Sequence, residues 1–154
     1  MIRIHTRDFG DIEIAEDKIL SFPNGLLGFS DNKRFALIAD PSELAEEKAV
    51  FYWLQSLDDA DIAFCLVDLI KLAPDYNPLV EEDQLTPLLP YNTEDLLIYN
   101  MAVIPENPKE LTVNMKAPIV INPQNRQGMQ AVCQNEDYAI RHRLFQPNIQ
   151  AKHS

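Results

Sequence analysis

The 154-residue chain has few glycines, cysteines and basic residues, and it has no long apolar run. Its four glycines are scattered, so neither of the usual glycine-rich phosphate-binding loops can form. Its two cysteines, Cys65 and Cys133, form no CxxC pair and stand in strand-like apolar segments, which predicts buried free thiols. No apolar segment approaches the ~18 residues of a membrane span, and the N-terminus lacks the apolar part of a signal peptide. We therefore expect a cytoplasmic protein that does not enter a membrane.

The shortage of basic residues leaves a strongly acidic chain. Thirteen Lys and Arg against 24 Asp and Glu give a net charge of −11. Such a chain repels phosphates, which argues against direct binding of nucleic acid and leaves basic partners open. The excess lies in residues 40–83, where twelve acids and two bases give −10, whereas the rest of the chain amounts to −1. Like charges also oppose self-association, so we expect a monomer when the protein is free.

Short strand patterns separated by turns are abundant. Period-two alternation on both sides of the RDFG sequence predicts an opening hairpin, and the PNG sequence at Pro23–Gly25 predicts the turn that ends the next strand. Gly128 is expected to close a later turn. Further strands are expected within residues 34–40, 50–57, 62–68, 95–104, 111–115, 117–133 and 138–145.

Helical patterns are short, and βαβ alternation is missing. One helical turn is predicted in residues 41–49, and one or two turns are predicted in residues 79–85. With at least seven strands, the pattern predicts one mainly β domain over residues 1–145, built as an antiparallel barrel or sandwich. Residues 146–154 are expected to form a flexible tail.

The sequence LDDADI places Asp58, Asp59 and Asp61 between two apolar segments. Three carboxylates this close together can hold a divalent cation, and a metal-dependent hydrolase is the enzymatic alternative that they suggest. The spacing of a calcium loop is broken at Ala63, and its central glycine and closing glutamate are missing. The other two interpretations are a solvated hairpin turn, in which Asp caps backbone N–H groups, and an acidic surface for a partner.

Two other side chains allow more than one interpretation. Trp53 shares one strand face with Phe51 and Gln55, and it is either part of the core or an exposed binding anchor. Arg126 stands in a turn, where its guanidinium either faces solvent or binds an anion. The three histidines are too far apart to suggest a site, and no catalytic triad can be assembled from the spacing.

Five motifs, in a fixed order, resemble the flagellar assembly factor FliW family. The motifs are FPNGLLGF (22–29), FALI (35–38), WLQSLDDADIAF (53–64), APIVIN (117–122) and RQGMQAV (126–132), and the likeness extends from about residue 2 to residue 144. The resemblance implies a small β-barrel-like protein without catalytic activity or cofactor. It also implies two partners: flagellin and the RNA-binding translational repressor CsrA. Antagonism of CsrA would then couple translation of flagellin to its secretion.

Two partner surfaces are hypothesised from the residues. A basic repressor would dock on an acidic surface by charge complementarity. The members of that surface are Asp58, Asp59, Asp61, Asp68, Asp75, Glu81, Glu82 and Asp83. A terminal helix of flagellin would dock in an apolar groove. The walls of that groove would include Phe51, Trp53, Tyr76 and Ile104.

Overall fold

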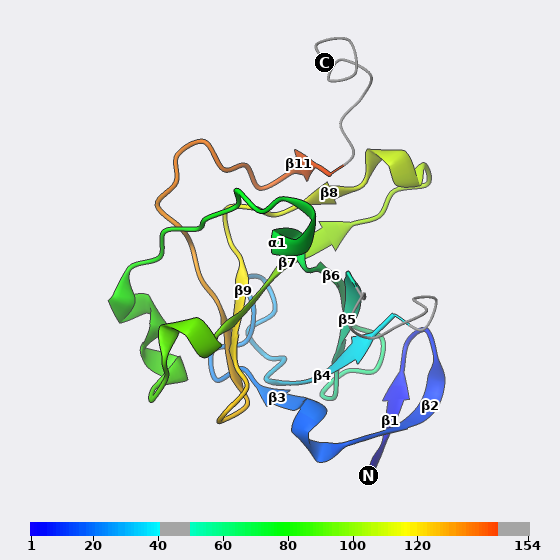
Figure 1. The fold of residues 1–154 in the computed structure, drawn as a ribbon. Helices are drawn as coiled ribbons and strands as arrows, with labels where there is room; N and C mark the ends of the chain where they lie inside the picture. Colours follow the sequence, from blue (N-terminus) through cyan, green and yellow to red (C-terminus); the bar gives the residue numbers. More distant parts are fainter. Residues whose placement is uncertain (41–49, 145–154) are drawn as a thin grey trace.

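The computed structural model describes residues 1–40 and 50–144, and most of its regular elements are short strands (Figure 1). The strands are β1 (Ile2–Thr6), β2 (Gly10–Ile14), β3 (Ile19–Ser21), β4 (Arg34–Ala39), β5 (Phe51–Ser56), β6 (Ala63–Val67), β7 (Leu97–Val103), β8 (Thr112–Val113), β9 (Ile119–Asn122), β10 (Gln127–Gln130) and β11 (His142–Arg143). The helical turns are α1 (Leu69–Leu72) and the 3-10 turns η1 (Glu16–Lys18), η3 (Glu82–Leu88), η4 (Thr93–Asp95) and η5 (Pro108–Glu110). The predicted mainly β class is confirmed.

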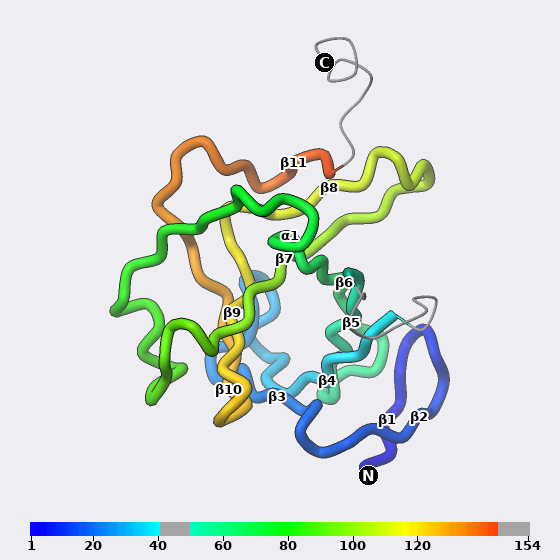
Figure 2. Tube along the Cα trace, viewed as in Figure 1, coloured from blue at the N-terminus to red at the C-terminus, as the bar shows by residue number. Residues whose placement is uncertain are grey.

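Seven strands close into a barrel (Figure 2). Their order around the barrel is β7, β6, β5, β4, β3, β10 and β9, and the pairing of β9 with β7 closes the ring. An odd number of strands cannot alternate in direction all the way round a closed ring, so at least one pair must be parallel. That pair is β3 with β10, and the other pairings are antiparallel. The barrel alternative is therefore correct, with one parallel seam that the sequence pattern did not predict.

Large apolar side chains fill the inside of the barrel. Alternate residues of a strand point to opposite faces, so each barrel strand sends every second side chain inward. Phe22 and Phe35 are fully buried there, with their ring centroids 5.2 Å apart in an edge-to-face contact. The other buried members of this core are Leu20, Leu26, Leu54, Leu66, Tyr99, Ile119 and Ile121. Removal of this apolar surface from water is the main force that holds the barrel closed.

Three segments cover the outer wall of the barrel. The β1–β2 hairpin packs its isoleucines, among them Ile4 and Ile14, against Ala36 of β4. Helix α1 and the residues that follow it cover Val67 and Val113 of β6 and β8. Turn η3 covers Val120 of β9 and Ala131, which follows β10. Because the outer wall is also apolar under these segments, the barrel strands are buried on both faces over much of their length.

Most predicted elements are found close to their expected positions. The opening hairpin, the Pro23–Gly25 turn and the strands on both sides of the acidic turn are confirmed. The helical turn expected at 79–85 occurs as η3, a few residues later. The helical turn expected at 41–49 and the tail expected at 146–154 lie outside the described residues, so the proposed end of the domain near residue 145 stays a prediction.

Two details of the prediction were wrong. Gly128 lies inside β10, paired with Ile121, and the turn before it contains Arg126 with a positive φ of 59°. The final strand pattern at 138–145 yields only the two residues of β11, because they pair with β8, which is itself two residues long.

Candidate partner-binding surfaces

The three aspartates of the β5–β6 hairpin, Asp58, Asp59 and Asp61, form a hydrogen-bonded turn. Oδ2 of Asp58 accepts the backbone N–H groups of Lys33 (2.6 Å) and Arg34 (3.1 Å), and this ties the segment before β4 to the turn. Oδ1 of Asp59 accepts the N–H of Asp61 at 3.0 Å. All three side chains are exposed. The interpretation as a solvated hairpin turn is therefore confirmed, with a structural role for Asp58 in addition.

The geometry of this turn does not favour the metal-dependent hydrolase. A cation site needs several carboxylate oxygens directed to one point, whereas Asp58 and Asp59 each direct an oxygen at a backbone N–H group. Within residues 1–40 and 50–144, no group of three or more His, Cys, Asp or Glu side chains is placed to hold a metal ion.

The other hypothesised acids lie away from this turn. Asp61 precedes β6 and Asp68 follows it, and five strand residues between them span about 17 Å. Asp68 is 3.8 Å from Lys71 in a half-exposed ion pair beside α1. Asp75 is exposed in the segment after α1. Asp61 and Asp68 therefore lie at opposite ends of β6, and the acidic surface expected from the sequence stays a prediction.

Glu81, Glu82 and Asp83 form the second dense acidic group, which we call the η3 acids. They line a hollow of about 580 Å³ together with the exposed Leu89 and the half-buried Tyr91. Hydrogen bonds fix this segment to the barrel: the side chain of Gln84 pairs with both backbone groups of Val132 (2.8 and 2.9 Å). Gln134 also donates to Oε1 of Glu81 at 2.8 Å. The carboxylates of Glu82 and Asp83 are exposed at a hollow that also has an apolar side, formed by Leu89 and Tyr91, where a basic, partly apolar side chain would fit.

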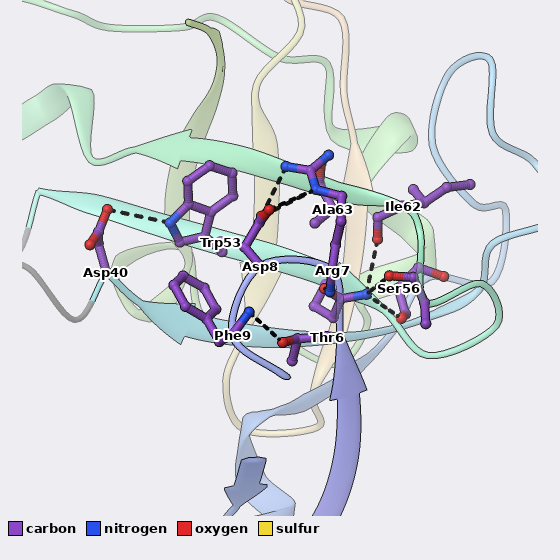
Figure 3. A network of polar contacts seen from close by, with 11 residues as sticks. Thr6, Arg7, Asp8, Phe9, Asp40, Trp53, Ser56, Ile62 and Ala63 are labelled. Atoms are coloured by element: carbon purple, nitrogen blue, oxygen red, sulfur yellow. Dashed lines mark hydrogen bonds and ion pairs between the residues drawn. The ribbon is translucent and has the colours of Figure 1, made fainter. Parts of the chain in front are cut away.

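Trp53 is half-buried beneath the tip of the β1–β2 hairpin (Figure 3). Its indole N–H donates to Oδ2 of Asp40 (3.3 Å), and the ring of Phe9 meets it edge-on at 6.3 Å between centroids. The Arg7 guanidinium lies 5.7 Å from the centre of the indole and donates to the carbonyl of Ala63. Trp53 therefore holds the hairpin in place, and its role as a binding anchor stays a prediction.

Gln55 is a structural centre that the sequence reasoning missed. It is only 2% exposed, and its Oε1 accepts the N–H of Arg7 at the hairpin tip. Its Nε2 lies 2.9–3.2 Å from the carbonyls of Ser56, Ala60 and Ile62, and so secures the acidic turn. The sequence does contain a signal for this role: Gln55 is a polar residue on the strand face that it shares with Phe51 and Trp53. If such an amide is buried, it must satisfy its hydrogen bonds.

The four groove residues, Phe51, Trp53, Tyr76 and Ile104, differ in exposure. Tyr76 is 5% exposed, and its hydroxyl donates to the carbonyl of Met115 and accepts from Asn100. Burial raises the pKa of Tyr76 above its ordinary value. Phe51 is half-buried against the cluster that contains Tyr76, whereas Ile104 is 47% exposed just after β7. The expectation that Tyr76 is an exposed wall was wrong, because its hydroxyl satisfies buried polar groups; Ile104 remains an accessible apolar candidate.

The two cysteines are free and buried, as predicted. Cys65 stands on β6 opposite Trp53, and burial raises the pKa of its thiol to about 11, with a smaller contribution from the charge of Asp40. A thiol of this kind is a poor nucleophile at neutral pH.

A closed seven-stranded barrel with three segments packed on its outer wall and two separate acidic groups defines the class as a small, decorated β-barrel. The chain belongs to the FliW family, because the family model described as FliW protein matches residues 3–144. The family resemblance found in the sequence motifs is thereby confirmed.

Proteins of similar sequence and structure match this chain along nearly its whole length. The flagellar assembly factor FliW of Caldicellulosiruptor saccharolyticus is 35% identical over 143 residues, which cover 93% of this chain and 90% of that protein. The flagellar assembly factor FliW of Thermoanaerobacter pseudethanolicus is 37% identical over 145 residues, 94% of each chain. A crystal structure of the flagellar assembly factor FliW superposes with a TM-score of 0.82 at 31% identity, covering 96% of this chain and 99% of that one.

Proposed function

We propose that this protein is a cytoplasmic, non-enzymatic flagellar assembly factor that binds flagellin and antagonises the translational repressor CsrA by direct protein–protein binding. The observation that supports the proposal is membership of the FliW family over residues 3–144, among relatives named flagellar assembly factor. In this proposal, secretion of flagellin frees the factor to capture CsrA, so that translation of flagellin follows its export.

Charge supports the CsrA part of the proposal. An RNA-binding repressor presents basic side chains to phosphates, and an acidic partner attracts the same side chains. The acids divide into the turn acids Asp59 and Asp61 at one end of β6 and the η3 acids beside the Leu89 hollow. The η3 acids combine charge with exposed apolar surface, which favours them as the stronger contact.

The CsrA contact can be tested with two charge-neutralising double variants. Asp59→Asn with Asp61→Asn removes the free charges of the turn and leaves Asp58 to bind Lys33 and Arg34. Glu82→Gln with Asp83→Asn removes two η3 charges and leaves Glu81 bonded to Gln134. Binding of CsrA is measured by calorimetric titration at low and high salt. The Glu82→Gln, Asp83→Asn variant should bind about tenfold more weakly than the unaltered protein, and its affinity should depend less on salt.

A matched control variant has the same net charge as the two test variants. Glu94→Gln with Glu106→Gln also removes two exposed carboxylates, at η4 and after β7, and should leave CsrA affinity within about twofold. If all three double variants bind CsrA alike at both salt concentrations, the acidic surfaces do not form the contact. If the unaltered protein fails to bind CsrA at all, that part of the proposal is wrong for this chain.

For flagellin, we propose an apolar contact that includes Ile104. Val103 and Ile104 are consecutive exposed apolar residues at the end of β7 (62% and 47% exposed), and exposed aliphatic side chains can anchor an amphipathic helix. Ile104→Asp should weaken binding of purified flagellin by at least about tenfold in a titration. Leu27→Asp, at a site in the turn after β3 that is 62% exposed, is the control and should bind normally. Equal binding by both variants would remove Ile104 from the interface.

Within the described residues, no helix is long and apolar enough to cross a membrane.

The proposed state of the free protein is a monomer. Light scattering of the purified chain should give the mass of one copy, 17.6 kDa, and should rise only when a partner is added. A stable larger mass without partners would contradict this part of the proposal.

A further inference from the structure

A basic hollow lies on the outer wall of the barrel, where η1, β3 and the β9–β10 turn meet. Its volume is about 310 Å³. Two arginines, Arg34 and Arg126, line it together with polar and apolar neighbours, and we call it the arginine hollow. The remaining lining residues are Ile2, Glu16, Ile19, Leu20, Ser21, Asn125 and Gln127. Two guanidiniums at one small concavity are unexpected in a chain with a net charge of −11.

Strand register explains how the polar lining residues come together. Ser21 of β3 lies opposite Arg34 of β4 and beside Gln127 of β10, across the parallel seam. Residues directly opposite each other on neighbouring strands have their side chains on the same face of the sheet. Leu20, the neighbour of Ser21, belongs to the barrel core, so this row of three faces outward. A guanidinium, a hydroxyl and an amide therefore stand side by side on the outer wall.

Arg126 adds a second guanidinium from an uncommon backbone conformation. Its φ of 59° is in the left-handed region, where Gly or Asn is usual, and it is the sole non-glycine residue with positive φ in the part of the chain that the structure describes. Its Nη1 donates to the backbone carbonyl of Glu16 at 3.1 Å, which orients the side chain along the hollow. A strained backbone at a residue that lines a concavity is an observation that points to a function of that residue.

Arg34 has its guanidinium available. Its backbone N–H is bonded to Asp58, but within residues 1–40 and 50–144 no hydrogen bond or ion pair occupies the guanidinium itself. The planar fork of a guanidinium matches the two oxygens of a carboxylate or phosphate. Ile2 and Ile19 form an apolar side of the hollow, and among the described residues Glu16 is the single carboxylate in its lining. This lining fits one oxyanion of low charge with a small apolar attachment.

We propose that the arginine hollow is a binding site for a single oxyanion group, gripped by Arg34 and Arg126 and hydrogen-bonded by Ser21 and Gln127. The oxyanion is either the carboxylate of an acidic peptide or a free inorganic anion. This site is separate from the acidic and apolar surfaces of the proposed function, and it provides a contact for an anionic ligand on a protein that otherwise repels anions.

The site can be tested by following backbone amide signals of the full chain by NMR during titration. Two probes distinguish the sources: inorganic phosphate, and a short neutral-ended peptide with one glutamate between two alanines. The amides of residues 19–21, 34 and 125–127 should shift in a saturable way, with a dissociation constant on the order of 1 mM for the better probe. Saturation by the peptide alone identifies a peptide ligand, and saturation by phosphate alone identifies a free anion.

Matched variants separate the hollow from general charge effects. Arg34→Gln with Arg126→Gly removes both guanidiniums, and Gly at position 126 tolerates the positive φ. This variant should bind the better probe at least about tenfold more weakly. Lys109→Gln with Arg141→Gln, two exposed positions elsewhere, removes the same charge and should bind within twofold. Glu16→Gln should strengthen binding, because it removes the repelling carboxylate.

Three results would overturn the site. The first is the absence of saturable shifts with either probe. The second is an equal response by the arginine variant and the matched control, which would indicate an adventitious ion only. The third is a set of saturable shifts located away from η1, β3 and the β9–β10 turn. Each readout is independent of CsrA and flagellin, so the site can fail while the proposed function holds, and the converse is equally possible.

Discussion

At the scale of single residues, fit and burial decide which side chains are allowed. Gly128 is inside β10, and a Cβ atom added to it would lie 2.5 Å from Cζ of Phe22. Phe22 is completely buried in the barrel core and cannot move aside. The requirement for glycine here comes from side-chain packing, not from backbone freedom.

Gly128→Ala should therefore lower the free energy of unfolding by roughly 3 kcal/mol, because it overpacks the core. Urea unfolding followed by far-UV circular dichroism measures this change. Gly28→Ala is the control: its φ is +83°, but no atom of residues 1–40 and 50–144 lies within 4 Å of the added atom, so only backbone strain of about 1 kcal/mol is expected. Equal losses for the two variants would contradict the packing explanation.

The thiols give a second prediction at this scale. Because burial raises the pKa of Cys65 to about 11, about one thiol in a thousand is ionised at pH 8. A thiol reagent at pH 8 should react slowly with the native protein and at once in urea. Rapid labelling of Cys65 in the native state would contradict the structure.

The same shift has a consequence for stability. The folded pKa of Cys65 lies above its ordinary value of 9.0. The contribution of this raised pKa to the free energy of unfolding is therefore fully present below pH 9 and is lost as the pH rises towards 11. The unfolding free energy of the unaltered protein should fall more steeply between pH 9 and 11 than that of a Cys65→Ala variant. Parallel curves for the two proteins would show that Cys65 does not contribute to this pH dependence.

At the scale of elements, short polar contacts fix segments that are too small to be stable alone. A two-stranded hairpin is marginal in water, yet β1–β2 is held by its isoleucines on β4 and by Arg7 and Phe9 on Trp53. Asp58 fixes the segment before β4 in the same manner, through two backbone N–H groups. Folding of these elements therefore depends on their tertiary contacts.

Arg7→Ala should loosen the tip of the hairpin, because it removes the contact with the indole and the hydrogen bond to Ala63. Trp53 is the single tryptophan of the chain, so a red shift of the protein's emission reports its exposure directly. The loss of stability should be about 1–2 kcal/mol. Arg3→Ala, on β1 of the same hairpin and without these contacts, should leave the emission unchanged. An unchanged spectrum for Arg7→Ala would contradict the docking role.

At the scale of the whole molecule, closure of the barrel determines cooperativity. β7 pairs with β6 through its C-terminal half and with β9 through its N-terminal half, so it joins the two ends of the ring. Loss of either pairing would open the barrel and expose its core. The barrel strands should therefore unfold together.

Hydrogen exchange tests this expectation. The amides of β4, β5, β6 and β7 should exchange at one common slow rate, set by global unfolding. Those of β11, which pairs with the two residues of β8, should exchange at least about 100-fold faster, because local opening is sufficient. Separate slow groups within the barrel would indicate that it does not unfold as one unit.

Local patterns predicted much of this fold. Period-two alternation located the hairpin β1–β2, short apolar strand patterns located β4 to β7, and Pro23–Gly25 located a turn, because such signals depend on neighbours in sequence. The family motifs predicted the barrel class. For the candidate surfaces, the sequence located the acids and the exposed Ile104. It could not reveal that Tyr76 is buried by Asn100 and Met115, since both are more than twenty residues away.

The sequence by itself determined the strand-rich character, the reduced thiols, the acidic excess and the family. The tertiary structure alone decided the parallel seam, because closing an odd ring is a property of all seven strands together. It also decided that Glu81, Glu82 and Asp83 line a hollow of their own, that Gln55 and Trp53 hold the first hairpin, and that Arg34 and Arg126 share one hollow. Each of these depends on distances between residues far apart in the chain, which folding sets and sequence spacing does not contain.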